Sequence, residues 1–153
     1  MSPVIRLALS RDALAIAALT MQDDRECGAV IEEGFLDRHA SAWLADAARV
    51  TFLAEAADGR PLGMVTAAVL TKLPSSRRPR GRWLHVSLLF VTPDARGAGI
   101  GASLLEALRL WASEHDVTRM QLNAAPEARS LYERAGFGPP SGSLMEWRAD
   151  SVR

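Results

Sequence analysis

The sequence of 153 residues has very few cysteines and histidines and no excess of charge of either sign. Cys27 is the only cysteine, which excludes an internal disulfide and a cysteine-rich zinc site. The three histidines, His39, His85 and His115, lack the spacing of metal ligands, so we expect no bound metal. The 18 basic and 18 acidic residues give a formal net charge of zero, so we expect no nucleic-acid partner.

Long apolar runs are lacking as well. No run reaches the roughly 18 to 20 residues that cross a bilayer, and the N-terminus has no basic-then-apolar signal segment. We therefore predict a cytoplasmic protein that does not bind membranes. Hydrophobic residues make up 48% of the chain, which is enough for one ordinary core, so residues 1–153 are predicted to form a single domain.

Residues 83–102 are the most informative stretch of the chain. Residues 83–91 are apolar on both alternate faces, which is typical of a strand covered on two sides. Apolar residues recur at helical spacing from Ile100, so a helix is predicted to begin near Gly99. The start of a helix leaves about four backbone N–H groups unpaired and carries a partial positive charge. The junction is therefore a candidate phosphate site.

The turn before this helix contains Gly97, Gly99 and Gly101, which would allow a diphosphate to approach the backbone. Arg96 would add a charge-assisted contact at the rim. The alternative is a tight turn whose glycines serve only chain reversal. The P-loop and dinucleotide motifs both fit poorly, because the turn has no lysine and Leu104 stands where the third glycine is required.

The residues that do match are Arg-x-x-Gly-x-Gly at Arg96, Gly99 and Gly101, preceded by Val-x-Pro at Val91 and Pro93. This pattern resembles the signature of the GCN5-related N-acetyltransferase superfamily. Residues 128–137, ARSLYERAGF, resemble the same superfamily's Ala-x-x-Leu-Tyr-Glu-x-x-Gly-Phe segment. The two motifs occur in the expected order and together cover roughly the C-terminal two fifths of the chain.

The resemblance implies an α/β (α+β) fold, with a mixed, twisted and splayed sheet flanked by helices on both faces. Patterning along the chain agrees with that order of elements. Strands are predicted at 4–9, 50–56, 62–73, 83–91, 117–123 and 144–147, the last closing the sheet. Helices are predicted from Ser10 or Asp12 to about 22–26, at 36–48, at 99–115 and at 126–135. The strands at 83–91 and 117–123 should be parallel.

The same resemblance implies transfer of an acetyl group from acetyl-CoA to a primary amine of a small molecule or peptide, directly within a ternary complex. In the family, pantetheine lies between the two parallel strands and pairs with backbone here at Leu89, Phe90 and Val91. The expected contacts to the cosubstrate continue through Arg96, Gly97, Ala98, Gly99, Ile100, Gly101, Ala102, Asn123 and Arg129. Many family members have asparagine where this chain has Ala125, so that role is vacant or moves to Asn123.

The chemistry requires a proton acceptor for the amine and a proton donor for the thiolate. By resemblance Tyr132 is the general acid, and the alternative is a half-buried core tyrosine. The family often places a glutamate on the central strand, and this strand has none. His85, Glu32, Glu33 or ordered water would then serve as the base, although His85 could equally be a satisfied core residue.

Residues 23–34 are acidic and contain two helix breakers, and they are predicted to be a mobile connection. By resemblance this region forms a wall of the acceptor site, which makes Glu32, Glu33 and Trp43 candidates for contacting a cationic amine. The alternative is a solvated loop beside a core tryptophan. Residues 74–82, with Arg77, Arg78, Arg80 and Arg82, are either a solvated connector or contacts for an acidic acceptor or the nucleotide phosphate.

Two other functions remain open. A non-catalytic acyl-CoA binding or sensing module would keep the pocket without the chemistry, and the missing strand glutamate and Ala125 favour it slightly. A phosphate-binding regulator unrelated to CoA would bind ATP or NAD instead. Edge pairing of a strand near the C-terminus would also allow a homodimer.

Overall fold

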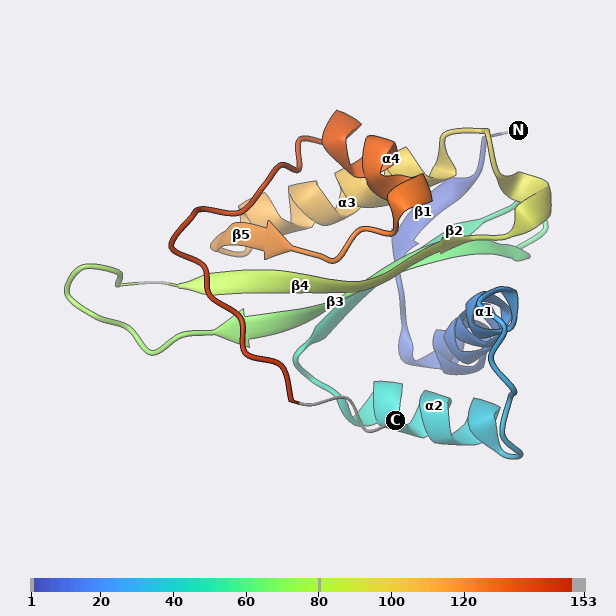
Figure 1. The fold of residues 1–153 in the computed structure, drawn as a ribbon. Coiled ribbons are helices and arrows are strands. Elements are labelled where there is room, and N and C mark those ends of the chain that lie inside the picture. The colour runs from blue at the N-terminus through green and yellow to red at the C-terminus, as the bar shows by residue number, and fades with distance from the viewer. Residues whose placement is uncertain (1, 80, 150–153) are drawn as a thin grey trace. The chain divides into compact units, whose positions relative to one another are not determined.

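A mixed five-stranded sheet forms the centre of a computed structural model of the chain, which describes residues 2–79 and 81–149 (Figure 1). The strands follow the chain in the order β1-β2-β3-β4-β5. β1 to β4 pair antiparallel, and β4 pairs parallel with β5, as predicted. Their bounds are β1 (Val4–Leu7), β2 (Arg49–Glu55), β3 (Pro61–Thr71), β4 (Arg82–Val91) and β5 (Val117–Gln121).

Helices cover both faces of this sheet, which confirms the predicted fold class. α1 (Ala13–Glu26) and α2 (Phe35–Ala45) lie on one face and α3 (Ile100–Glu114) on the other (Figure 1). These elements all belong to one compact unit that ends at Asn123. A second unit begins at Ala124 and contains a 3₁₀ turn (Pro126–Ala128) and α4 (Arg129–Arg134).

The core is built from alternate residues of the central strands. Met64 and Phe90, which are register partners on β3 and β4, pack with Ile16 and Leu19 of α1. The next residue, Val65, is fully buried and points to the opposite face, which α3 covers. α3 buries a stripe of Ile100, Leu104, Leu105, Leu108 and Ala112, at the spacing that the sequence predicts.

β4 contains an irregularity in the middle of its pairing with β3. Thr66 pairs with Leu88 and Ala67 with Val86, so Ser87 is the extra residue of a β-bulge. The bulge shifts the side-chain alternation by one residue. As a result His85, before the bulge, and Leu88, after it, lie on the face of the sheet that α1 covers.

Three predicted elements differ in the structure. Residues 144–147 form no strand, because the segment has no pairing partner among the described residues. Residues 23–26 are the last turn of α1 and not a connection. α2 ends at Ala45 because the backbone of Asp46 adopts an extended conformation. The Asp46 carboxylate accepts hydrogen bonds from Ala48 N and Arg49 Nε. Of the 74–82 segment, Arg80 lies outside the described residues.

A buried carboxylate joins β1 to the start of α1. Asp12 is 7% exposed and accepts two bonds from the Arg6 guanidinium, at 2.8 and 2.9 Å, and one from Leu9 N at 2.7 Å. Arg6 also binds Glu55 of β2 through Nε at 3.0 Å. The hydrogen bonds from Arg6 lower the pKa of Asp12 from 3.8 to about 2, although burial opposes the shift.

We expect Asp12→Asn to lower the free energy of unfolding by roughly 1–3 kcal/mol at pH 7, because it removes a buried ion pair. A carboxyl whose pKa is lowered by folding stabilises the protein fully above pH 3.8 and loses that contribution as the pH falls towards 2. Urea titrations from pH 3 to 8 should therefore show the difference between variant and wild type narrowing below about pH 4. Asp37→Asn, at an exposed site, is the control and should stay within about 0.5 kcal/mol. A pH-independent difference for Asp12→Asn would contradict this role.

Candidate functional site

The turn between β4 and α3 is held in shape by two left-handed glycines. Gly97 and Gly99 both have φ near +80°, and Gly99 is the N-cap of α3. A Cβ added at either position would meet nothing within 4 Å. The backbone conformation, and not crowding by the protein, therefore requires glycine here, and the space beside each is open.

The unpaired backbone amides of this turn indicate an anion-binding site. The first intrahelical bond of α3 is from Ser103 N to Gly99 O, at 3.0 Å. The amides of residues 97–102 donate to no acceptor within residues 2–79 and 81–149. Successive unpaired amides at the start of a 15-residue helix suit a phosphate group.

The Arg96 side chain is held against the protein. Its Nε donates to Val91 O at 2.8 Å, its Nη2 lies 2.7 Å from Glu26 Oε2, and its guanidinium lies 5.6 Å from the centre of the Phe90 ring. In this structure Arg96 therefore links the glycine turn to the last turn of α1. The sequence pattern predicted a contact at the rim of the turn and did not reveal this partner.

The last half of β4 pairs with one neighbour only. Its register with β5 ends at His85 and Gln121, whereas its register with β3 continues through Leu89, Phe90 and Val91. On the β5 side the backbone beyond His85 has no strand partner in the described chain, so the two parallel strands are splayed as predicted. Asn123 follows β5, two residues past its end.

β3 approaches this part of β4 very closely. A Cβ on Gly63 would lie 2.6 Å from Phe90 O, so only glycine fits at that position without a backbone shift. The amide of Thr92 then donates to Leu62 O at 2.8 Å, which holds the end of β4 where it enters the glycine turn. Residues 89–91 are thus fixed from the β3 side alone.

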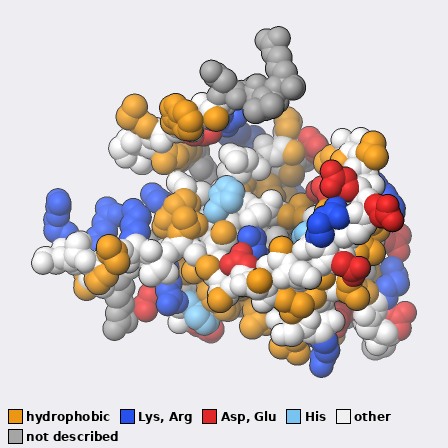
Figure 2. All heavy atoms as spheres, turned by 90° about the horizontal axis from the view of Figure 1, so that it is seen from below, with side chains coloured by type: hydrophobic (Ala, Val, Ile, Leu, Met, Phe, Trp, Pro, Cys, Tyr) orange, Lys and Arg blue, Asp and Glu red, His pale blue; other side chains and the backbone are white. Residues whose placement is uncertain are grey.

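A cavity of about 400 Å³ lies on the α1 and α2 face of the sheet. Figure 2 views the molecule from this face, on which acidic, basic and apolar side chains are all exposed. The floor of the cavity includes Ser87 and Leu88, the residues at the β4 bulge. The other lining residues are Ile16, Thr20, Asp23 and Asp24 of α1, His39, Ala42 and Trp43 of α2, and Asp46, Arg49 and Thr66.

Trp43 lines this cavity and is also anchored to the sheet. Its Nε1 donates to Thr51 Oγ1 at 3.0 Å, and Thr51 Oγ1 lies 2.8 Å from Thr66 Oγ1. The ring packs against buried residues of the core. Both interpretations of Trp43, as a cavity wall and as a core residue, therefore describe part of its environment.

Asp23 and His39, two ionisable residues that line the cavity, have shifted pKa values. Burial raises the pKa of the Asp23 carboxyl, and the neighbouring Asp24 and Glu26 raise it further, against Arg96. Burial lowers the pKa of His39, helped by Arg49 and opposed by Asp24. Sequence analysis missed these cavity residues, although positions 16, 20, 23 and 24 share one helical face once α1 is known to reach Glu26.

Glu32, Glu33 and His85, the other candidates for the acceptor side, do not line this cavity. Glu32 is exposed and pairs with Arg38 at 3.1 Å, and Glu33 is exposed. His85 is half-buried on β4 between Ala68 and Gln121. None of the three is among the described residues that line the cavity.

Tyr132 and Arg129 belong to the second unit. Tyr132 packs edge-to-face on Phe137, with the ring centres 5.8 Å apart. Phe137 N donates to Tyr132 O, and Gly136 ends the helix with φ +96°, as predicted. Arg129 Nε lies 2.9 Å from Glu133 Oε1, one turn along α4.

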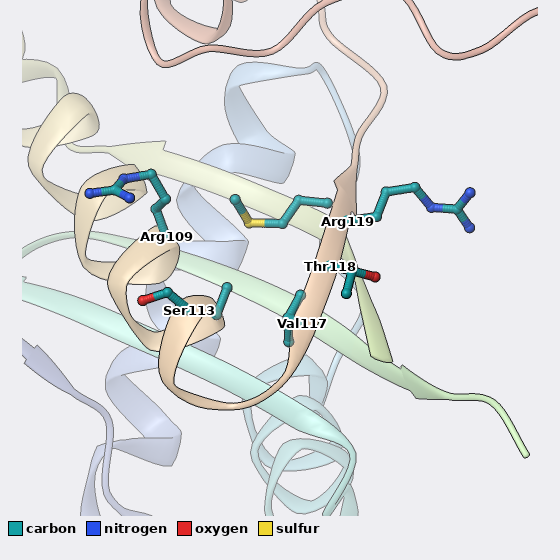
Figure 3. Close-up of a pocket in the computed structure, with 7 residues that line it drawn as sticks. Arg109, Ser113, Val117, Thr118 and Arg119 are labelled. Carbon is teal, nitrogen blue, oxygen red and sulfur yellow. The ribbon is translucent and has the colours of Figure 1, made fainter. Parts of the chain in front are cut away.

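A smaller hollow of about 190 Å³ lies between α3 and β5 (Figure 3). Its basic side chains are already engaged, because Arg109 pairs with Glu106 at 2.6 Å and the Arg119 guanidinium lies 5.0 Å from the Trp83 ring centre. Within the described residues, no three His, Cys, Asp or Glu side chains gather as metal ligands. No described helix combines the length and apolar character needed to cross a membrane.

The comparisons with known proteins agree with this geometry. The chain is similar to a predicted acetyltransferase from Clostridium acetobutylicum solved with acetyl-CoA, with a TM-score of 0.77, 19% identity, and coverage of 95% of this chain and 96% of that one. It is similar to a ribosomal-protein-alanine N-acetyltransferase from Brucella melitensis biovar Abortus 2308, with a TM-score of 0.69, 26% identity and 99% of both chains covered. A glucosamine-6-phosphate N-acetyltransferase from Arabidopsis thaliana gives a TM-score of 0.68 at 19% identity, over 96% of this chain and 99% of that one.

No curated protein sequence matches the chain significantly. The model of the acetyltransferase (GNAT) family matches residues 15–137, which include the β4 strand, the glycine turn and the Tyr132 helix. Members of this family use acetyl-CoA as the acetyl donor. The chain belongs to the acetyltransferase (GNAT) family.

Proposed function

We propose that the protein transfers the acetyl group of acetyl-CoA to a primary amine of a small molecule or peptide, directly within a ternary complex. One observation carries the proposal. The part of β4 beyond His85 pairs only with β3, and the chain continues from it into the unpaired amides of residues 97–102. We propose that the two compact units act together as one domain over residues 1–153. The family match supports this, because it runs across their boundary at Asn123.

The residues that would hold acetyl-CoA follow this path. The amides of Gly97, Ala98, Gly99, Ile100, Gly101 and Ala102 would bind the diphosphate, and the β5-facing backbone of residues 89–91 would pair with pantetheine. Asn123 and Arg129 would add polar contacts, and Arg96 would keep the turn in place through Val91. When bound, acetyl-CoA supplies the acetyl thioester, and a backbone N–H near Val91 would stabilise the negative carbonyl oxygen.

The acceptor would enter the 400 Å³ cavity beside the β4 bulge. Trp43 would form one wall, and the carboxylates of Asp23 and Asp24 would favour a cationic amine. Glu32 and Glu33, being exposed, would act at the entrance. The alanine N-terminus and the amino sugar in the names of two relatives support testing both peptides and small amines.

A non-catalytic acyl-CoA module remains the second candidate, because β4 carries no glutamate to act as a base. It would bind acetyl-CoA without turnover on any amine. A regulator that binds ATP or NAD at the glycine turn would be stabilised by those nucleotides instead. Ligand binding and thiol release together separate the three functions.

Gly99→Glu should abolish binding of acetyl-CoA, because the new carboxylate would occupy and repel the diphosphate site. For the wild type, ligand at 100 times its Kd adds about 2.7 kcal/mol, which is roughly 5–10 °C in Tm for a chain of this size. Thermal-shift assays with acetyl-CoA, CoA, ATP and NAD measure this directly.

The matched control is Gly59→Glu, in the turn between β2 and β3. Gly59 has φ +83° and no atom within 4 Å of an added Cβ, so the backbone strain is the same. This variant should lose intrinsic stability but keep its stabilisation by acetyl-CoA. An acetyl-CoA shift that persists in Gly99→Glu, or stabilisation by ATP or NAD alone, would contradict the proposed site.

Tyr132→Phe should lower kcat for release of CoA thiol by roughly 10²–10⁴-fold, because it removes the proposed proton donor for the thiolate. The acetyl-CoA shift in Tm should remain, since the change deletes one hydroxyl group. Thiol release is to be followed with peptides bearing N-terminal alanine, polyamines, amino sugars and aminoglycosides. A variant that is as active as wild type would remove Tyr132 from the chemistry.

A further inference from the structure

His39 is an ionisable side chain of the acceptor cavity that neither family motif contains. It lies in the second turn of α2, with its ring 5.6 Å from the Phe35 ring centre to centre. Its Nδ1 is buried and has no hydrogen-bond partner in the described chain. Its Nε2 is not buried and bonds to none of the described residues, so this nitrogen is available to a molecule in the cavity.

The groups around His39 come from three parts of the chain. Arg49 and Asp46 line the same cavity and pair with each other, Nε to Oδ2 at 3.0 Å, while α1 contributes Asp23 and Asp24. Burial and Arg49 lower the pKa of His39, and Asp24 only partly opposes this. A lowered pKa keeps the ring neutral near pH 7, and a neutral imidazole accepts protons.

The proposed reaction needs such an acceptor at this place. A primary amine reaches the cavity mostly as an ammonium ion, which has no lone pair to attack a carbonyl carbon. The cavity floor is the β4 bulge at Ser87 and Leu88, directly before the segment proposed to hold pantetheine. Of the three histidines, only His39 is among the described lining residues.

We propose that His39 is the proton acceptor of acetyl transfer, with the substrate ammonium held beside Asp23 and Asp24. This inference rests on the proposed function. The ammonium gives one proton to His39 Nε2, and the nitrogen lone pair then forms the C–N bond to the acetyl carbon as the C–S bond breaks. As the amide forms, the nitrogen releases its second proton to solvent, the Tyr132 phenol donates its proton to the thiolate, and Tyr132 regains a proton from solvent. His39 returns its proton to solvent, so the net products are amide, CoA thiol and one proton.

The test compares two variants of this residue with a matched histidine. His39→Gln removes the titrating ring, and His39→Ala leaves space for imidazole. His115→Gln is the control, because His115 follows α3 outside the cavity and bonds through Nδ1 to Trp111 O at 2.7 Å. Thiol release from acetyl-CoA is measured from pH 5 to 9 with spermidine, lysine, glucosamine and a peptide bearing N-terminal alanine.

For whichever of these amines the wild type acetylates, kcat should fall at least about 100-fold in both His39 variants, while KM for acetyl-CoA changes less than about threefold. In the wild type kcat should decline at low pH with a midpoint below 6.5, as the base becomes protonated. That decline should be absent from His39→Gln. Added imidazole should restore part of the activity of His39→Ala, and His115→Gln should behave as wild type.

The outcomes separate this inference from the proposed function. An active wild type with an unchanged kcat and pH profile in His39→Gln overturns the role of His39 alone, and the same losses in His85→Gln would assign the base to His85. If the His39 variants lose stability or acetyl-CoA binding, imidazole rescue of His39→Ala supports the role and failure of rescue overturns it. A wild type that binds acetyl-CoA but acetylates none of the amines overturns both proposals.

Discussion

The early end of the hydrogen-bond ladder between β4 and β5 is the constraint on which the site depends. The two parallel strands pair only as far as His85 and Gln121, while β3 holds β4 up to Val91. Backbone N–H and C=O groups on the unpaired side of β4 would destabilise the protein if they were buried without a hydrogen-bond partner. This edge must therefore bond to water or to a ligand. The glycine turn that follows adds further unpaired amides on the same path. In the proposed function, acetyl-CoA would be the partner of both groups of donors and acceptors.

The last turn of α1 connects the two halves of the site. Asp23 lines the 400 Å³ cavity, and Glu26, one turn further along, binds the Arg96 guanidinium at the glycine turn. A shift of this helix end would therefore alter the cavity and the turn together. The exposed Arg96–Glu26 pair contributes little stability by itself. Its effect is on position, because Arg96 also bonds to Val91 O at the end of β4.

Local signals predicted much of the fold. The two-sided apolar pattern of residues 83–91, the glycines before Ile100 and the helical apolar spacing from Ile100 each depend on neighbours in sequence, and each element formed as expected. The 144–147 segment failed because alternation shows only that a strand is possible, whereas a strand exists only with a partner. The cavity residues Asp23, Asp24 and His39 were not predicted as site residues for a similar reason. The cavity joins positions from Ile16 to Leu88, and no spacing rule connects them.

The sequence by itself determined the family, the glycine turn and the neutral charge, since these depend on residue types at short fixed spacings. Tertiary structure alone decided where β4 and β5 separate, how the Ser87 bulge redirects the side chains of β4, and that His39 lies in the cavity with Asp23 and Asp24. These features arise from strand register and from the packing of α1 and α2 on the sheet. Both are set by contacts between residues distant in the chain, and the burial that shifts the pKa of His39 exists only after those contacts form.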